Sequence, residues 1–358
     1  MPTRKTQSGF SLLELLVASS LGLLVILAMA SLFKTGMDTT FVITQRAETQ
    51  QNMRAAIELM SNDIGLAGSG LPSGGLQLST AGPLSKIACN QGGTCYIPGD
   101  KYPPSGGGTP NYMYAIEPGY GNGVEASAVI PNAPGQINSS ITSIYCDYNF
   151  PLTNFTFTIA SATTATAVPI SSANQPNNIL APGGLNLGDL LLFTVNVAGN
   201  GKSSSGTSLV QNAAVVAEIT GTSGTSGSTA GCGPGTCAWT LTFATGDALQ
   251  FNQTGGTNNL SSVSAAVAAA AAAGSASQTN VCRLNAVSYF LEVPPAGGTV
   301  QNPRLMRQVN GQLAVPVADN IINMQFTYDI IDSTTGKVVA NQPDPIGAGA
   351  SQIGRAHV

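Results

Sequence analysis

The clearest hydrophobic pattern is an uninterrupted apolar run near the N-terminus. No Asp, Glu, Lys or Arg occurs in the 19 residues from Leu15 to Phe33, whereas Arg4 and Lys5 lie before the run. A helix of that length extends roughly 28 Å, close to the thickness of a bilayer's hydrocarbon core. The run predicts one membrane span over about residues 12–33. Since basic residues favour the cytoplasmic side, the chain beyond Phe33 is predicted to be exported.

Beyond the span, the hydrophobic pattern becomes one-sided. Apolar residues recur at helical spacing, separated by polar ones, at Met53, Ile57, Met60 and Ile64. This spacing predicts a helix that continues the span and packs against a globular domain along one face. Several glycines and Pro72 are predicted to end it near Leu66, because proline cannot extend a helix. We therefore expect a helical domain over residues 10–70, with a helix roughly 85 Å long.

Short β-prone runs separated by turn-forming clusters replace the helical pattern from Ser73 onward. They predict strands at residues 141–148, 155–159, 190–197, 213–220, 238–243, 287–293 and 322–331. Segments rich in Gly, Ser, Pro or Thr are predicted to be exposed loops, at residues 101–111, 202–208 and 221–235. An alanine-rich stretch, 264–274, favours a short helix. The predicted fold class is α+β, a long N-terminal membrane and stem helix followed by an antiparallel β-rich head over residues 71–352.

Six cysteines indicate disulfides in an oxidising compartment, and six allow 15 pairings. They are Cys89, Cys95, Cys146, Cys232, Cys237 and Cys282. The close pairs 89/95 and 232/237 could each staple a Gly-rich loop, which leaves Cys146 for Cys282 as a longer bridge. A metal site is the alternative, but no histidine or second close Cys pair accompanies either spacing. We expect neither a metal nor a cofactor.

Composition argues against nucleic acid and against common catalytic chemistry. Charged residues make up 8% of the chain and the formal net charge is −4, so a phosphate-binding basic face is not expected. The single histidine is His357, within the last six residues. Without another histidine, Ser-His-Asp and Cys-His catalysis lack a base. The sequence therefore predicts that the protein is not an enzyme.

Residues 353–358 match what a widely used sequencing adapter encodes in one reading frame. We expect these residues not to be native, and the head before them to be truncated. This expectation matters because it removes His357 from any functional argument.

Three interpretations compete for the N-terminal segment. A secretory signal could be cleaved at the small residues Ala28 and Ala30, and an uncleaved anchor is the second possibility. Neither accounts for Glu14, an ionisable residue near the start of the apolar run, where a charge is costly. The stretch from Gly9 to Val17 instead resembles the leader junction of type IV prepilins and type II secretion pseudopilins.

This resemblance assigns roles to three residues. A prepilin peptidase would remove residues 1–9 by cutting after Gly9 and would methylate the new N-terminal Phe10. Glu14 would act in assembly, because its carboxylate can offset the positive amine of Phe10 on an adjoining subunit. The head would then be pilin-like.

Residues 51–68 narrow the resemblance to PilW-like minor pilins, with weaker similarity at 187–192, 305–308, 316–321 and 324–329. It implies a minor pilin of the type IV pilus, with major and minor pilins and the inner membrane as partners. The head would lie in the periplasm before assembly and at the cell surface afterwards. Open alternatives are a type II secretion pseudopilin and a binding or enzymatic domain on an uncleaved anchor.

Overall fold

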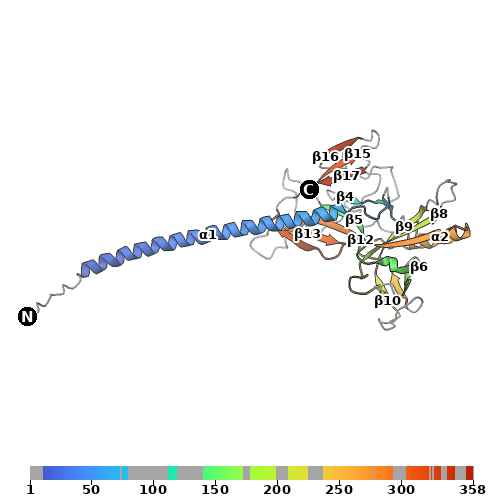
Figure 1. Ribbon diagram of the computed structural model, residues 1–358, viewed down its shortest axis with the longest axis horizontal. Coiled ribbons are helices and arrows are strands. Elements are labelled where there is room, and N and C mark those ends of the chain that lie inside the picture. Colours follow the sequence, from blue (N-terminus) through green and yellow to red (C-terminus); the bar gives the residue numbers. More distant parts are fainter. Residues whose placement is uncertain are drawn as a thin grey trace, which may run out of the picture. The chain divides into compact units, whose positions relative to one another are not determined.

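The computed structural model describes residues 11–72, 75–79, 112–118, 140–171, 178–198, 209–224, 237–275, 277–292, 304–321, 324, 326–331, 337–342 and 352–357. The chain divides after Ala55 into two compact units. The first contains most of helix α1 (Leu12–Gly65), and the second contains the last turns of α1 together with the strands (Figure 1).

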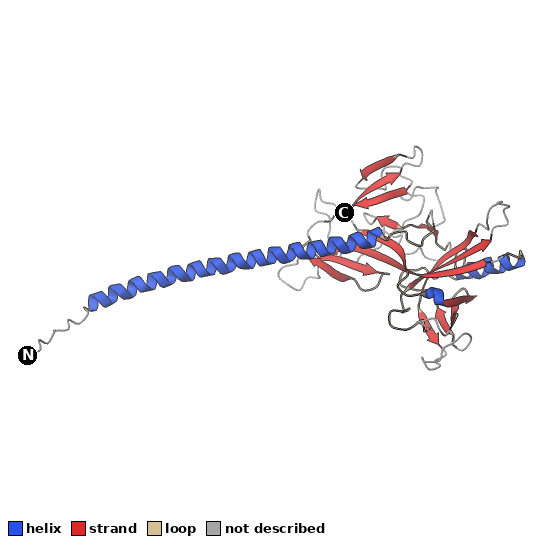
Figure 2. Cartoon of the chain, in the orientation of Figure 1, coloured by secondary structure: helices blue, strands red, loops and turns tan. Residues whose placement is uncertain are grey.

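The predicted α+β fold class is confirmed, since a single long helix precedes antiparallel sheets (Figure 2). Each of the seven predicted strand segments overlaps a strand of the structure. These strands are β5 (Ile141–Asp147), β6 (Phe155–Ser161), β8 (Leu190–Ala198), β9 (Leu209–Glu218), β11 (Trp239–Thr242), β12 (Ser277–Glu292) and β15 (Thr327–Ile331). The alanine-rich stretch forms α2 (Leu260–Ala272).

Further strands were not predicted from β-prone runs. They are β1 (Leu76–Gln77), β3 (Tyr112–Met113), β4 (Ile116–Pro118), β7 (Thr164–Pro169), β10 (Gly221–Gly224), β13 (Arg304–Val309), β14 (Val315–Asp319), β16 (Val338–Gln342) and β17 (Gln352–His357), and a short 3-10 helix, η2 (Leu152–Asn154), precedes β6.

The loop prediction for residues 221–235 is wrong at its start, because β10 pairs antiparallel with β11. Gly224 lies opposite Trp239, and a side chain at Gly224 would collide with the indole ring. The glycine that lowers strand propensity here is what makes room for Trp239. The other predicted loops, 101–111 and 202–208, and residues 225–235 lie outside the described residues.

Strand β12 organises the largest sheet, which has the order β14-β13-β12-β5-β4 with β8 and β9 added alongside β12. On one side β12 pairs with β5 over Arg283 to Tyr289. On the other side it pairs first with β8 and then, from Val287, with β13. One strand therefore joins two halves of the head. The remaining sheets have the orders β10-β11-β7-β6, β16-β15-β17 and β1-β3.

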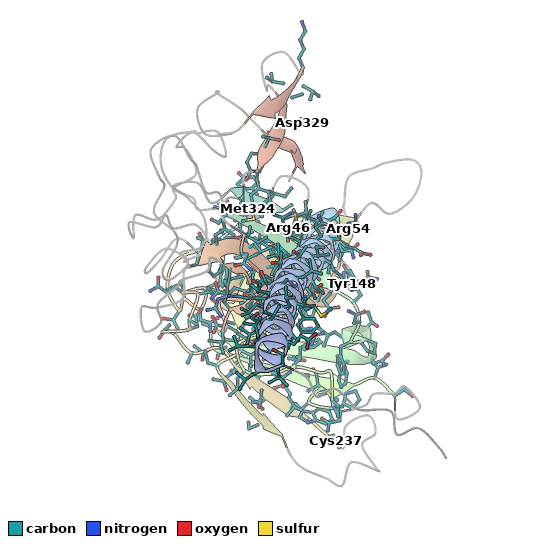
Figure 3. The ribbon with its side chains drawn as sticks, turned by 90° about the vertical axis from the view of Figure 1, so that its left-hand side faces the viewer. Arg46, Arg54, Tyr148, Cys237, Met324 and Asp329 are labelled. Atoms are coloured by element: carbon teal, nitrogen blue, oxygen red, sulfur yellow. A yellow bond between two sulfur atoms is a disulfide. The ribbon has the colours of Figure 1, made fainter. Side chains whose placement is uncertain are left out.

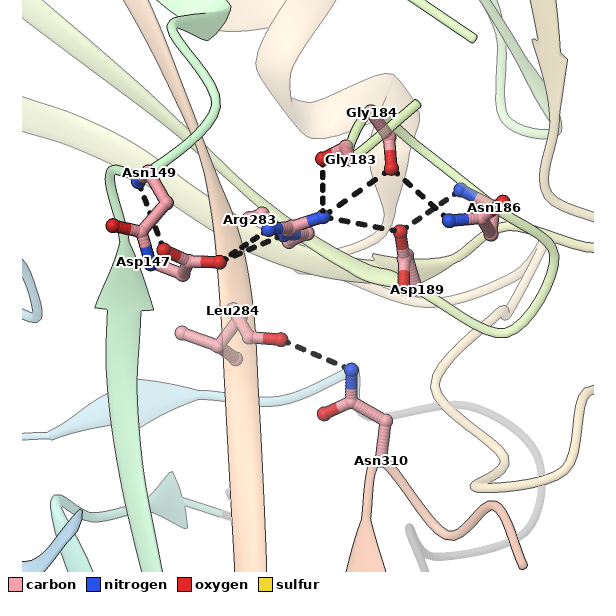
Figure 4. Close-up of polar contacts among 9 residues, drawn as sticks. All are labelled: Asp147, Asn149, Gly183, Gly184, Asn186, Asp189, Arg283, Leu284 and Asn310. Carbon is pink, nitrogen blue, oxygen red and sulfur yellow. Dashed lines mark hydrogen bonds and ion pairs between the residues drawn. The ribbon is translucent and has the colours of Figure 1, made fainter. Parts of the chain in front are cut away.

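Asn310 occupies the gap beside β12 between the end of its pairing with β8 and the start of its pairing with β13. Its backbone has a φ of 51°, and the Asn310-Gly311 turn closes the hairpin between β13 and β14. The Ala286 N–H donates to Asn310 Oδ1 at 2.8 Å. Asn310 Nδ2 donates to the Leu284 carbonyl at 3.2 Å, as Figure 4 shows. The amide side chain thus replaces the missing stretch of neighbouring strand.

Three apolar clusters form the core. One joins α2 to β6, β7, β8, β9 and β11, with Phe157 and Phe193 in edge-to-face contact at 6.1 Å. A second joins Ala56 and Met60 of α1 to β5, β12 and β13. A third lies around Leu76, Leu192 and Leu284.

The prediction that Met53, Ile57, Met60 and Ile64 form the packed face of the helix is wrong for the first two. Met53 is 43% exposed and Ile57 46% exposed. The buried positions of α1 are Ala56, Met60 and Asp63. Ile57 follows Ala56 by one residue and is therefore turned about 100° away from it. The small side chain of Ala56 allows the close approach, and Ile64 packs partly against the same cluster.

Residues 352–357 form β17, which pairs with β15. The boundary expected between residues 352 and 353 thus falls inside a strand. The foreign origin of residues 353–358 and the limits of the leader, stem and head domains stay predictions.

Candidate functional site

The first described residues form a helix cap. Ser11 precedes α1, and its Oγ accepts the Leu13 N–H at 3.2 Å. The Ser11 N–H in turn donates to Glu14 Oε2 at 3.4 Å. This reciprocal arrangement is a capping box, in which two otherwise unpaired donors of the first turn are satisfied. Glu14 therefore has a hydrogen-bond partner within its own chain. Besides its predicted role in assembly, it helps to begin helix α1.

Sequence reasoning missed this second role of Glu14. The signal was present, because a Ser followed three residues later by a Glu just before an apolar run is the pattern of a capping box. Gly9 and Phe10, the predicted cleavage and methylation positions, lie outside the described residues. Their roles stay predictions.

The N-terminal half of α1 is suited to an apolar environment. Its leucines, valines and isoleucines are exposed, and α1 is the one described helix long and apolar enough to cross a membrane. The hydroxyls of Ser19 and Ser20 donate to the carbonyls of Leu16 and Val17 at 3.0 and 2.9 Å. Because those donors are satisfied within the helix, they add little cost in lipid.

Residues 4–30 match the family model described as the prokaryotic N-terminal methylation motif. The matched span contains Gly9, Phe10 and Glu14 together with most of the apolar run. The match supports a pilin-like protein that is processed and assembled as type IV pilins and pseudopilins are, and it implies a prepilin peptidase as the processing enzyme. With the apolar helix, it indicates membrane anchoring followed by incorporation into a pilus. No curated protein and no solved structure gave a match.

A buried carboxylate fixes the last turn of α1 to the head. Asp63 accepts hydrogen bonds from the hydroxyls of Tyr145 at 2.8 Å and Tyr289 at 2.5 Å. It also forms an ion pair with Arg307, whose Nε lies 2.9 Å from Asp63 Oδ2. These donors come from β5, β12 and β13, three adjacent strands. We call Asp63, Tyr145, Tyr289 and Arg307 the stem clamp.

The pKa shifts of the stem clamp agree with its hydrogen bonds. Burial alone would raise the pKa of Asp63, but hydrogen bonds from Arg307, Tyr289 and Tyr145 outweigh burial, so this pKa is lowered. Burial and the Asp63 carboxylate raise the pKa of Tyr145 to about 12 and also raise that of Tyr289. Both hydroxyls therefore remain protonated donors at neutral pH. The cluster positions the helix and has no group poised to exchange protons near neutrality.

Cys146 and Cys282 form a disulfide between β5 and β12, with their Cα atoms 5.7 Å apart. Sequence reasoning had reached the same pair by elimination. The bridge lies under the turn that follows α1, because a side chain at Gly70 would collide with the Cys146 sulfur. Cys237, labelled in Figure 3, is buried and disulfide-bonded. Cys89, Cys95 and Cys232 lie outside the described residues, so the two short pairings stay predictions.

Asp147 and Arg283, which follow the two bridged cysteines in sequence, belong to an ion-pair network. Figure 4 shows its contacts. The Arg283 guanidinium pairs with Asp147 and donates to the carbonyls of Gly183 and Gly184 at 3.1 and 3.2 Å. Asp189 lies 4.0 Å from the same guanidinium. Arg283 thus ties β5 and β12 to the loop before β8. The network is a structural brace, since each charged group is engaged with a partner.

Two other buried carboxylates also hold backbone. Glu218 accepts the N–H groups of Ala248 and Leu249, and Asp247 accepts those of Phe251 and Asn252. Among the described residues, no three His, Cys, Asp or Glu side chains gather into a group that could hold a metal ion. These acidic groups therefore organise the loop after β11.

Glu117 in β4 should make the stability of the head depend on pH. Its side chain is buried, with the Tyr114 N–H donating to Oε1 at 2.9 Å, and burial raises the pKa of Glu117 to about 8. Because the folded state holds this proton more tightly than the unfolded state, the stabilisation is complete below about pH 4.5 and is lost as pH rises towards about 8. We expect the free energy of unfolding of Glu117→Gln, measured with urea, to change less with pH across that range than the free energy of unfolding of the wild type. The exposed Glu58→Gln is the control, and an unchanged slope in Glu117→Gln would refute the assignment.

Proposed function

We propose that this chain is a PilW-like minor pilin that takes part in assembly of the type IV pilus. The observation that carries the proposal is the N-terminal methylation motif at residues 4–30, which runs directly into the continuous helix α1. A helix that is apolar and exposed over its first half requires a hydrophobic partner, which is lipid before assembly and the helices of other pilins afterwards. The β-rich head would lie in the periplasm before assembly.

The proposed role is structural rather than enzymatic. It is supported by the engagement of Asp63, Asp147, Glu218 and Asp247 in bonds that hold the fold. A type II secretion pseudopilin shares the N-terminal chemistry, so the two assemblies are distinguished by which filament the tagged chain enters.

Processing is tested by the mass of the N-terminal peptide from the membrane-extracted protein. We expect a chain that begins at a methylated Phe10, because cleavage after Gly9 precedes methylation in this pathway. Retention of Met1 would indicate an uncleaved anchor, and a chain beginning at Ser31 would indicate an ordinary secretory signal. Either result would overturn the proposal.

The assembly role of Glu14 can be separated from its capping role. Glu14→Gln retains an oxygen that can accept the Ser11 N–H but removes the charge that would pair with the Phe10 amine. We expect Glu14→Gln to insert into the membrane and to be cleaved, yet to be at least about tenfold depleted from filaments, because a buried amine needs a charged partner.

The matched control is Ser11→Ala, which removes the capping hydroxyl at a cost of about 1 kcal/mol and keeps the charge of Glu14. It should assemble like the wild type. If Glu14→Gln assembled normally while Ser11→Ala did not, Glu14 would be a capping residue only.

A further inference from the structure

A groove of about 800 Å³ lies in the second unit, at the first residues of β12. Residues of η2, β6, β8, β12 and α2 line it, as do Gly70, Tyr148 and Ile170 outside these elements. Its volume falls within the range of small-molecule sites, roughly 300–1,000 Å³. Among the described residues that line it, none carries a charge.

One face of β8 and β12 presents amide and hydroxyl groups at this groove. Val195 of β8 belongs to the apolar core, so its neighbours Thr194 and Asn196 lie on the opposite face of the sheet. The strand register places Asn280 beside Thr194 and Gln278 beside Asn196. Directly opposed residues of an antiparallel pair share a face. These four side chains therefore form one group, which we call the amide face.

The amide face is accessible to a ligand. Gln278 and Asn280 are exposed, and together with Thr194 they line the groove. Thr194 Oγ1 donates to the Asn280 carbonyl at 3.4 Å, which leaves the hydroxyl oxygen as an acceptor. Each side-chain amide offers both donors and an acceptor. One amide can therefore bond two neighbouring hydroxyl groups of the same ligand.

Tyr148 adds an exposed aromatic ring to the same groove. It follows the last residue of β5, is 63% exposed and is labelled in Figure 3. A side chain at Gly70 would collide with the Tyr148 hydroxyl, so this hydroxyl lies against the Gly70 backbone. The turn after α1 thus supports the end of the ring and leaves its body exposed. The negative face of such a ring attracts C–H groups.

These features favour a neutral ligand that is rich in hydroxyl groups. Tight binding of a carboxylate or phosphate uses Arg, Lys or several converging N–H donors, and the described lining offers no Arg or Lys. A purely apolar ligand would cover the amides without bonding them, at a cost of about 1–3 kcal/mol for each unpaired group. A sugar ring meets both requirements, because its hydroxyls surround its rim and its C–H groups form an apolar face.

We propose that this groove binds a neutral oligosaccharide. Gln278, Asn280 and Thr194 bond the hydroxyl groups of the sugar, and Tyr148 packs against the apolar face of one sugar ring. The binding site lies in the β-rich head and does not depend on the proposed role in pilus assembly, so either proposal can fail without the other.

The test uses the full-length protein in a detergent without a sugar head group and three probes, maltotetraose, cellotetraose and chitotetraose, measured by titration calorimetry. We expect at least one probe to bind the wild type. Tyr148→Ala and Asn280→Ala should each bind it at least about tenfold more weakly. The matched control is Thr158→Ala, which changes an exposed residue of β6 outside the groove and should bind like the wild type. A hyaluronan tetrasaccharide, which carries carboxylates, should bind at least about tenfold more weakly than the neutral probe.

Several results would overturn the proposal. They are an absence of binding by all three neutral tetrasaccharides, unchanged binding in Tyr148→Ala or in Asn280→Ala, and hyaluronan binding as tight as that of the neutral probe. An equal loss in Thr158→Ala would also overturn it, because the effect would then not come from the groove. Tighter binding of a neutral peptide of alternating Thr and Val than of every tetrasaccharide would show that the groove accepts a peptide instead.

Discussion

Replacing Asp63 with alanine is expected to reduce the free energy of unfolding of the head by about 3 kcal/mol. The substitution leaves the Arg307 guanidinium without its buried counterion and two tyrosine hydroxyls without their acceptor. Breaking a buried pair costs about 3–5 kcal/mol, and the partial exposure of Arg307 places this case at the lower end. Urea unfolding followed by circular dichroism measures the change.

The effect of Asp63→Ala should also depend on pH. Because the pKa of Asp63 is lowered in the folded state, its contribution is present above its ordinary value of 3.8 and is lost as pH falls through the folded value. The wild type and Asp63→Ala should therefore converge in strong acid. The control is Glu58→Ala on the same helix, whose exposed side chain should contribute less than about 0.5 kcal/mol. A difference that is the same at neutral and strongly acidic pH would mean that the carboxylate charge is not what stabilises the stem clamp.

Removing the Cys146–Cys282 disulfide by a double substitution to alanine should destabilise the head by about 4–5 kcal/mol. The bridge spans 136 residues of sequence, and the loop-closure entropy that it removes from the unfolded chain grows with that separation. The same substitution removes a covalent link between β5 and β12, next to the ion pair of Asp147 with Arg283. The urea midpoint of the double variant, compared with that of the oxidised wild type, measures the loss.

A reductant separates this bridge from the other cysteines. It should lower the midpoint of the wild type to that of the double variant or below, and any further shift in the double variant reports the remaining disulfides. A double variant less than about 1 kcal/mol below the wild type would contradict the prediction and would indicate that β5 and β12 are held by their ladder alone.

The two predictions concern contacts that differ in how visible they were in the sequence. The Cys146–Cys282 pair was reached by elimination, because cysteines form a small set and two close pairs could be set aside. Asp63 gave no such signal, since a single carboxylate in the last turns of a predicted helix is usually solvated. Its partners lie 82, 226 and 244 residues away along the chain. No local pattern encodes such distances.

Strand prediction shows the same limit. Segments such as Leu190 to Val197 were found because their β-branched and aromatic residues are buried on a sheet. The first ten residues of β12 were missed because they are mostly polar, and their strand conformation depends on pairing with β8. Gly221 to Gly224 were predicted as a loop for a related reason, since only the fit against Trp239 makes a strand of them.

The sequence by itself indicated how the N-terminal segment of this protein behaves. An apolar run of membrane length, its flanking basic residues and the Gly9-Phe10-Glu14 junction are local patterns, and their chemistry depends little on the rest of the chain. The tertiary structure alone decided which face of α1 is buried, how Asp63 is held and how Asn310 bonds β12 between two strand partners. Those features arise from groups far apart in sequence that meet only when the sheet forms.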